Sequence, residues 1–176
     1  MEDNNFASEQ MDAPNSNNGQ PHVQPMFTPL TADIIIKRVR EGAVIPTRAS
    51  DMAAGYDLYA WLGKDSLTIK PHSTEIVTTG LQMQLPAGMF AGIFARSGIS
   101  AKRGLRPANC TGVIDGDYRG EYMVALHNDT DEPQTINDGE RIAQMVLLPY
   151  VHMNFIESEN IAPTERGSGG FGSTGL

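Results

Sequence analysis

The sequence predicts an all-β protein, a barrel or a sandwich of about ten short strands with one helical turn. Two observations carry this prediction. Apolar residues alternate with polar ones in many short stretches, and glycine, proline and asparagine interrupt these stretches at close intervals. A third observation argues against the helical fold classes, because no part of the chain offers ten residues of convincing helical period.

The expected first strand contains Ile34–Ile36 and is followed by a connection that ends at Pro46. One short helix is expected at Ser100–Arg103, where Gly104 stops it. Pro149 interrupts the last long strand. The other strands are expected within residues 54–60, 67–69, 74–79, 81–85, 89–95, 112–115, 122–126, from 136 onward, at 142–148, and again at 150–156 beyond the proline.

The composition of the chain limits its partners. Thirteen Lys and Arg residues stand against 21 Asp and Glu residues, which gives a formal net charge of −8. This balance argues against broad binding to the backbone of a nucleic acid, so any phosphate ligand must be held by a local site. With 176 residues, 40% of them hydrophobic, the chain can bury the core of one domain.

Cys110 is the single cysteine, which rules out an intrachain disulfide, and the four histidines form no Cys/His metal cluster at usable spacing. No apolar run approaches the roughly 18 residues of a membrane span. No Lys or Arg precedes Lys37, whereas leader peptides need early positive charge. The sequence therefore predicts a soluble protein of the cytoplasm with no membrane partner.

Two terminal segments differ from the domain, which is assigned to residues 31–165. Residues 1–30 are rich in Asn, Gln, Pro and Ser, which predicts a disordered arm whose simplest role is that of a solvated tail. Residues 166–176 contain five glycines and cannot pack as a strand. They lack the lysine and the following helix of a P-loop. They are either a linker-like tail or a mobile segment whose Arg166 and Phe171 close over a ligand with one anionic and one flat end, such as a nucleotide.

The stretch from Gly112 to Gly120 places two carboxylates, an aromatic ring and a cation at the end of a strand. On a straight strand Asp115 and Asp117 share a face about 7 Å apart, close to the spacing of a carboxylate pair around a water molecule. The alternative is a turn in which the aspartates cap backbone N–H groups, with Tyr118 as a half-buried strand residue.

A second candidate is Arg96-Ser97-Gly98, which follows the expected strand at 89–95. A guanidinium, a hydroxyl and a backbone without a side chain can together hold a phosphate at the start of a helical turn. The alternative is an ordinary serine cap beside a surface arginine. A third candidate is Gln144, a polar residue in an apolar strand, which either serves a ligand or bonds to a neighbouring strand. Arg141, three residues earlier, is expected to face the opposite way.

Taken together and in this order, these segments resemble the five motifs of the trimeric dUTPases, the deoxyuridine triphosphate nucleotidohydrolases. The matching segments are residues 54–60, 96–100, 112–122, 139–144 and 166–175. The resemblance covers residues 33–176 and excludes the arm. It implies a jelly-roll-type β-barrel, assembled as a homotrimer, that hydrolyses dUTP to dUMP and pyrophosphate with Mg²⁺, keeps uracil out of DNA and supplies dUMP for dTMP synthesis.

The resemblance also implies that each active site is shared between subunits. One subunit would supply the first, second and fourth motifs, a neighbour the third, and the remaining subunit the tail. In this arrangement Asp115 is the general base that activates water for attack on the α-phosphorus. Tyr118 lies under the deoxyribose and excludes a 2′-hydroxyl. Asn109 reads uracil, with the hairpin backbone at Gly112, Val113 and Ile114.

The remaining roles that the resemblance implies concern the phosphates. Arg96, Ser97, Gly98 and Gln144 bind phosphate oxygens. The phosphates are the direct ligands of Mg²⁺, while Asp57 holds one of its coordinated waters. In the tail, Arg166 reaches the γ-phosphate, and Phe171, beside Gly170, stacks on uracil. Arg141 is expected to be structural and to bond a carboxylate within the trimer, and Asp117 and Arg119 are expected to be hairpin or interface residues.

Asp115 and Tyr118 would point to opposite sides of a straight strand, so a shared pocket requires the chain to bend at Gly116-Asp117. Two other functions stay open on the same fold. One is deamination of dCTP, although that family has a serine where Gly98 stands and lacks the tail motif. The other is a non-catalytic trimeric scaffold, which should have lost Asp115 or Arg166. The sequence also leaves open a binding role for the arm and the reactivity of Cys110.

Overall fold

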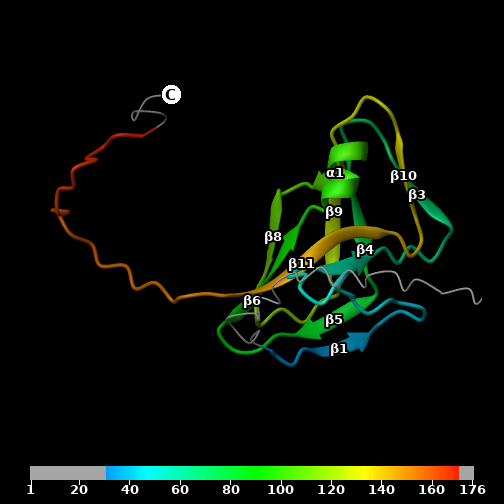
Figure 1. Ribbon diagram of the computed structural model, residues 1–176, viewed down its shortest axis with the longest axis horizontal. Coiled ribbons are helices and arrows are strands. Elements are labelled where there is room, and N and C mark those ends of the chain that lie inside the picture. The colour runs from blue at the N-terminus through cyan, green and yellow to red at the C-terminus, as the bar shows by residue number, and fades with distance from the viewer. Residues whose placement is uncertain (1–30, 171–176) are drawn as a thin grey trace, which may run out of the picture. The chain divides into compact units, whose positions relative to one another are not determined.

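A computed structural model describes residues 31–170 of the chain (Figure 1). Within these residues the structure contains eleven strands and one short helix. The elements in chain order are β1 (Ile35–Arg38), β2 (Tyr56–Tyr59), β3 (Ser66–Ile69), β4 (Thr74–Thr78), β5 (Leu81–Gln84), β6 (Met89–Phe94), α1 (Ser97–Arg103), β7 (Leu105–Pro107), β8 (Thr111–Ile114), β9 (Met123–Asn128), β10 (Gln134–Asn137) and β11 (Arg141–Pro149). The predicted all-β class with one short helix is confirmed.

The strands form four antiparallel sheets. The largest has the order β2-β11-β6-β8, the second has the order β4-β9-β7, and β1-β5 and β10-β3 form two pairs. In the largest sheet β11 pairs with β2 on one side and β6 on the other, and β6 also pairs with β8 (Figure 1). This sheet brings together segments that are up to about ninety residues apart in sequence.

The core follows the period of two that the sequence shows. In the segment of β5, Leu81, Met83 and Leu85 are buried, whereas Gln82 and Gln84 between them are not. Each fully buried aliphatic side chain of this kind contributes about 1.5–3 kcal/mol. Fully buried aliphatic residues come from every sheet and include Leu58, Ile69, Val77, Leu105, Leu126, Ile136 and Ile142.

Three local predictions need correction. The helix α1 begins at Ser97, three residues before the expected start, and ends as predicted at Gly104, which has a left-handed φ of 60°. The strand β7 is not among the predicted strands, because three residues that end in a proline are too short to show a period. Residues 150–156 lie in neither a strand nor a helix. No helix in the described part of the chain is long and apolar enough to cross a membrane.

Candidate active site

A surface hollow of about 810 Å³ has a volume within the range of small-molecule sites. It lies where the segment before β2, the end of β6, the start of α1 and the middle of β11 meet. Its lining includes six residues that matter for chemistry: Asp57, Arg96, Ser97, Gly98, Cys110 and Gln144.

Asp57 on β2 is 8% exposed and receives two guanidinium groups. The Nε atom of Arg96 lies 2.6 Å from Oδ1 and its Nη2 lies 3.5 Å from Oδ2. Arg141 Nη1 lies 3.2 Å from Oδ2. One carboxylate therefore orients two cations and leaves this corner with a net positive charge, which suits an anionic ligand.

The start of α1 adds backbone donors to this corner. The first intrahelical bond runs from Ser100 N–H to the carbonyl oxygen of Arg96, so the N–H groups at the first helical positions have no acceptor within the helix. The first turn carries no acidic residue, and a Cβ atom added at Gly98 would meet nothing within 4 Å. Ser97 and Gly98 thus leave an open space in front of N–H groups, as an anion requires.

Gln144 on β11 stands opposite Asp57 on β2 and Phe94 on β6. Its Nε2 donates to the carbonyl oxygen of Ala95 at 2.9 Å, so the amide does bond to a neighbouring segment, and this bond uses one of its two hydrogens. A Cβ atom at Gly55 would lie 2.5 Å from Gln144 Oε1. Gly55 therefore leaves the space that the amide occupies.

Arg141 meets the larger hollow through Asp57, although the sequence predicts that it faces away from Gln144. The pairing of β11 with β2 is irregular between Arg141 and Ala143, and the guanidinium of Arg141 reaches Asp57 in the larger hollow. Arg141 does bond a carboxylate, as expected of a structural residue, and this carboxylate belongs to the same chain.

A smaller hollow, of about 190 Å³, contains Asp115 and Tyr118. β8 ends at Ile114, and a turn closed by the bond from Tyr118 N–H to the Asp115 carbonyl oxygen, 3.1 Å long, follows it. The interpretation of Asp115 and Asp117 as a pair on one strand face is therefore wrong, because the strand ends before either residue. The bend at Gly116-Asp117 is present, and the lining of the hollow consists of Val113, Ile114, Asp115, Tyr118, Glu121 and Met123.

The position of Tyr118 is fixed by its neighbours. Its hydroxyl donates to the carbonyl oxygen of Glu121 at 3.1 Å, and a Cβ atom at Gly120 would lie 2.2 Å from its hydroxyl oxygen. Arg119 Nη1 donates to the carbonyl oxygens of Gly116 and Tyr118 at 2.8 and 2.9 Å, which closes the turn. This contact agrees with the expected role of Arg119 as a hairpin residue.

Two residues beside Tyr118 are not among the predicted site residues. Glu121 accepts the backbone N–H of Gly80 at 2.9 Å and faces Arg40 at 3.4 Å. Tyr122 is 1% exposed, its ring centroid lies 6.1 Å from that of Tyr118, and its hydroxyl has no hydrogen-bond partner among the described residues. Burial raises the pKa of Tyr122 above its ordinary value of 10.0. The contacts of Glu121 and the ring contact of Tyr122 follow no period of the sequence, so only the structure reveals them.

Asn109 lies in the turn between β7 and β8 and is exposed. A Cβ atom at Gly112 would lie 3.5 Å from Asn109 Nδ2 and 3.1 Å from Ile93 Cβ. The amide of Asn109 therefore lies over the start of β8, where Gly112 leaves space, and the backbone of β8 is paired with β6 from Thr111 to Ile114.

The two hollows have no lining residue in common. Four residues predicted to bind phosphate line the first hollow, namely Arg96, Ser97, Gly98 and Gln144. The predicted general base Asp115 and the ring of Tyr118 line the second, so one chain does not bring the two sets into one cavity. Arg166 is exposed, and its Nε donates to the carbonyl oxygen of Gly169 at 2.9 Å. Arg166 and Gly170 line neither hollow, and Phe171 lies outside the described residues. Residues 31–170 contain no group of three or more His, Cys, Asp or Glu side chains that could hold a metal ion.

Comparison with known proteins shows which family this chain matches. Residues 41–175 match the dUTPase family. A deoxyuridine 5′-triphosphate nucleotidohydrolase of Hydrogenobaculum is 41% identical over 143 residues, which are 81% of this chain and 98% of the relative. One from Desulfitobacterium hafniense is 50% identical over 133 residues, 75% of this chain and 87% of the relative. Among solved structures, the dUTPase of Staphylococcus bacteriophage 80alpha with dUPNHPP has a TM-score of 0.75 and 26% identity, and the match covers 83% of this chain and 100% of that one.

Proposed function

This chain belongs to the dUTPase family, and we propose from this premise how its residues hydrolyse dUTP to dUMP and pyrophosphate. The match in fold confirms the jelly-roll-type barrel expected from the sequence. The observation that carries the mechanism is that two sets of residues lie in separate hollows. The larger hollow holds a cationic corner without a general base, and the smaller one holds a carboxylate beside an aromatic ring. The reaction removes dUTP from the precursors of DNA and supplies dUMP.

The proposed enzyme is a homotrimer in which the larger hollow of one copy meets the smaller hollow of another. This arrangement gives each phosphate corner a carboxylate free to act as general base, because both oxygens of its own Asp57 already accept guanidinium groups. The exposed segment after β11 supports it, because Val151, Met153 and Phe155 alternate with polar residues and are 85%, 74% and 85% exposed. Apolar side chains in such a row are usually covered by a partner.

The cationic corner binds the triphosphate. Arg96, fixed by Asp57, and the N–H groups of Ser97 and Gly98 take phosphate oxygens, and Gln144 donates its second amide hydrogen. Because the guanidinium of Arg96 is already oriented by a carboxylate, little side-chain freedom is lost when the phosphates bind. These phosphate contacts align the α-phosphorus for in-line attack.

Asp115 of the neighbouring copy takes the proton of the attacking water and meets the sugar 3′-hydroxyl. A positioned general base is typically worth about 10²–10⁴-fold in rate. Tyr118 lies against the deoxyribose, where its ring fills the volume of a 2′-hydroxyl. Asn109 and the backbone of Gly112 to Ile114 contact uracil and leave no room for the methyl group of thymine.

Mg²⁺ fits these residues as an ion held mainly by the substrate. Asp57 is a single carboxylate whose two oxygens already accept guanidinium groups, so it suits a water on the ion better than the ion itself. When bound, Mg²⁺ neutralises charge on the phosphate oxygens and orients the chain of phosphates.

The tail completes the proposed site. Arg166 reaches the γ-phosphate, Gly170 allows close approach of the backbone, and Phe171 stacks on uracil. Closure of the tail excludes bulk water. We place the enzyme in the cytoplasm, in line with its one unpaired cysteine.

Pyrophosphate release from dUTP, dCTP, dTTP and UTP by the full-length protein with Mg²⁺ tests the proposal. Only dUTP should be hydrolysed at a high rate. Release of ammonia from dCTP would identify a deaminase, and binding of dUTP without pyrophosphate release would identify a scaffold.

The variant Asp115→Asn tests the role of the base. It should bind dUTP as before and lose about 10²–10⁴-fold in turnover. Asp117→Asn is the matched control, since the same change two residues away lies outside the hollow and should leave the rate unaltered. Full turnover in Asp115→Asn would refute the mechanism.

A further inference from the structure

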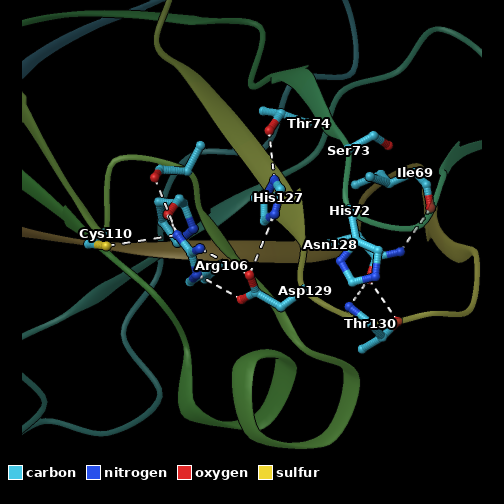
Figure 2. A network of polar contacts seen from close by, with 12 residues as sticks. Ile69, His72, Ser73, Thr74, Arg106, Cys110, His127, Asn128, Asp129 and Thr130 are labelled. Atoms are coloured by element: carbon cyan, nitrogen blue, oxygen red, sulfur yellow. Dashed lines mark hydrogen bonds and ion pairs between the residues drawn. The ribbon is translucent and has the colours of Figure 1, made fainter.

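Arg106 on β7 links two segments that are distant in sequence. Its Nε lies 2.7 Å from Oδ2 of Asp129 and its Nη2 lies 3.0 Å from Oδ1. Its Nη1 donates to the carbonyl oxygens of Pro107 and Ala108, both at 3.2 Å, and lies 3.8 Å from Cys110 Sγ. Figure 2 shows Arg106 between Cys110 and Asp129. Every nitrogen of the guanidinium has a partner, so its plane is fixed.

The carboxylate end of this link is anchored to the core. The backbone N–H of Asp129 donates to the carbonyl oxygen of Gly104 at 2.9 Å, and its Oδ1 lies 3.5 Å from His127 Nε2. The preceding residue, Asn128, is fully buried, and its side-chain amide donates to the carbonyl oxygen of Ile69 (Figure 2). The same amide donates to the carbonyl oxygens of Lys70 and Glu132. The hydrogen bond with Arg106 lowers the pKa of Asp129 and raises the pKa of Arg106, so both are charged at neutral pH.

The other end of the link is the turn that carries Asn109. The N–H of Cys110 donates to the carbonyl oxygen of Pro107 at 2.9 Å, which closes the turn. Cys110 has a φ of 61°, a left-handed conformation that residues with a side chain disfavour. Such a conformation persists only where the surroundings impose it. Arg106 supplies such a constraint, because it holds the carbonyl groups of the two residues before Asn109.

We propose that Arg106 is a positioning residue for base recognition: braced on Asp129, it holds the turn that presents Asn109 to uracil. This inference rests on the proposed function. The contacts of Arg106 involve Pro107, Ala108, Cys110 and Asp129, none of which is assigned to phosphate or to the attacking water. Its loss should therefore weaken binding of the base and spare the phosphate corner and the chemical step.

Two ligands of the full-length enzyme separate these effects. dUMP carries the base, whereas inorganic tripolyphosphate carries only phosphates. In Arg106→Met, which keeps a stem of similar length and loses every N–H, dUMP should bind about tenfold more weakly, the effect of one lost base-positioning hydrogen bond. Inhibition by tripolyphosphate and kcat for dUTP should stay within about twofold of the unchanged enzyme, while KM for dUTP rises.

Three further variants define the mechanism. Asp129→Asn should weaken dUMP binding like Arg106→Met, and the double variant should lose no more than either single one, because both remove the same link. Arg106→Lys keeps the charge without the fork and should recover little of the affinity. Asp131→Asn is the matched control, since it removes the same charge from the same loop without touching Arg106, and it should bind dUMP normally.

Each outcome has one meaning. Unaltered dUMP affinity in Arg106→Met, or full recovery in Arg106→Lys, would overturn the positioning role. Equal losses for dUMP and tripolyphosphate with a lower midpoint of thermal unfolding would assign Arg106 to general stability and also overturn it. Should Arg106→Met not fold, Asp129→Asn provides the same comparison. Lack of pyrophosphate release by the unchanged enzyme would instead refute the proposed function itself.

Discussion

Gly120→Ala should impair catalysis through Tyr118 alone. A Cβ atom at position 120 would lie 2.2 Å from the Tyr118 hydroxyl oxygen and 2.4 Å from its Cζ atom. Non-bonded carbon atoms prefer a separation of about 3.5–4.0 Å, so the Cζ atom and its ring must withdraw by roughly 1.1 Å. Gly120 does not have a positive φ, so alanine adds no backbone strain of its own. A misplacement of about 1 Å in a group that positions the substrate can reduce the rate about 10²-fold.

The measurement is kcat/KM for dUTP and for UTP, together with thermal unfolding. We expect kcat/KM for dUTP to fall about 10²-fold, and the preference for dUTP over UTP to fall with it, because the displaced ring no longer excludes a 2′-hydroxyl. Tyr118→Ala provides the control background, in which Gly120→Ala should add no further loss. A normal rate in Gly120→Ala, or an equal loss in both backgrounds, would refute this reasoning.

The remaining predictions concern stability and the tail. Tyr122→Phe removes a buried hydroxyl without a partner among the described residues and should raise the free energy of unfolding by about 1–3 kcal/mol. Burial raises the pKa of Tyr122 above its ordinary value of 10.0. The unchanged protein should therefore lose stability as the pH rises above that value, and the variant should lose less. A lower unfolding midpoint in the variant would show that the hydroxyl has a hydrogen-bond partner in the assembly. Asn128→Ala leaves buried carbonyl groups without donors and should lower the free energy of unfolding in urea by about 2–4 kcal/mol, whereas the exposed Asn137→Ala should alter it little. Deletion of residues 166–176 should leave a folded protein by circular dichroism with little pyrophosphate release, and an undiminished rate would contradict a role for the tail.

Much of the fold was predictable because the strands are half-buried and alternate. The period of two placed β5 correctly, and Gly104 marked the end of α1. The start of α1 was missed, because Ser97 and Gly98 are poor helix formers and show no periodic signal. β7 was missed for a related reason, since a three-residue strand that contains Pro107 is defined by its partner β9 rather than by its own sequence.

For the candidate site, the sequence predicts a set of residues but not how they are arranged. The period of two could not show that β8 ends before Asp115, which made Asp117 look like its partner. The contacts of Asp57 with Arg96 and Arg141 join residues 39 and 84 positions apart, and no local pattern encodes them. The contacts of Glu121 with Gly80 and Arg40 join residues 41 and 81 positions apart, and Arg106 reaches Asp129 over 23 positions. The motifs predict which residues take part, and the pairing of strands decides which of them meet.

The separation of the two hollows makes catalysis a property of the proposed assembly rather than of the chain. Dilution that dissociates the trimer should abolish activity while each barrel stays folded. Chains with different defects should also complement one another. A copy without Asp115 keeps its Arg96 corner, and a neighbour without Arg96 keeps its Asp115, so together they form one complete site. Two inactive variants, unfolded and refolded together, would then regain activity that neither has alone, and a mutation in one copy would be partly masked by the others.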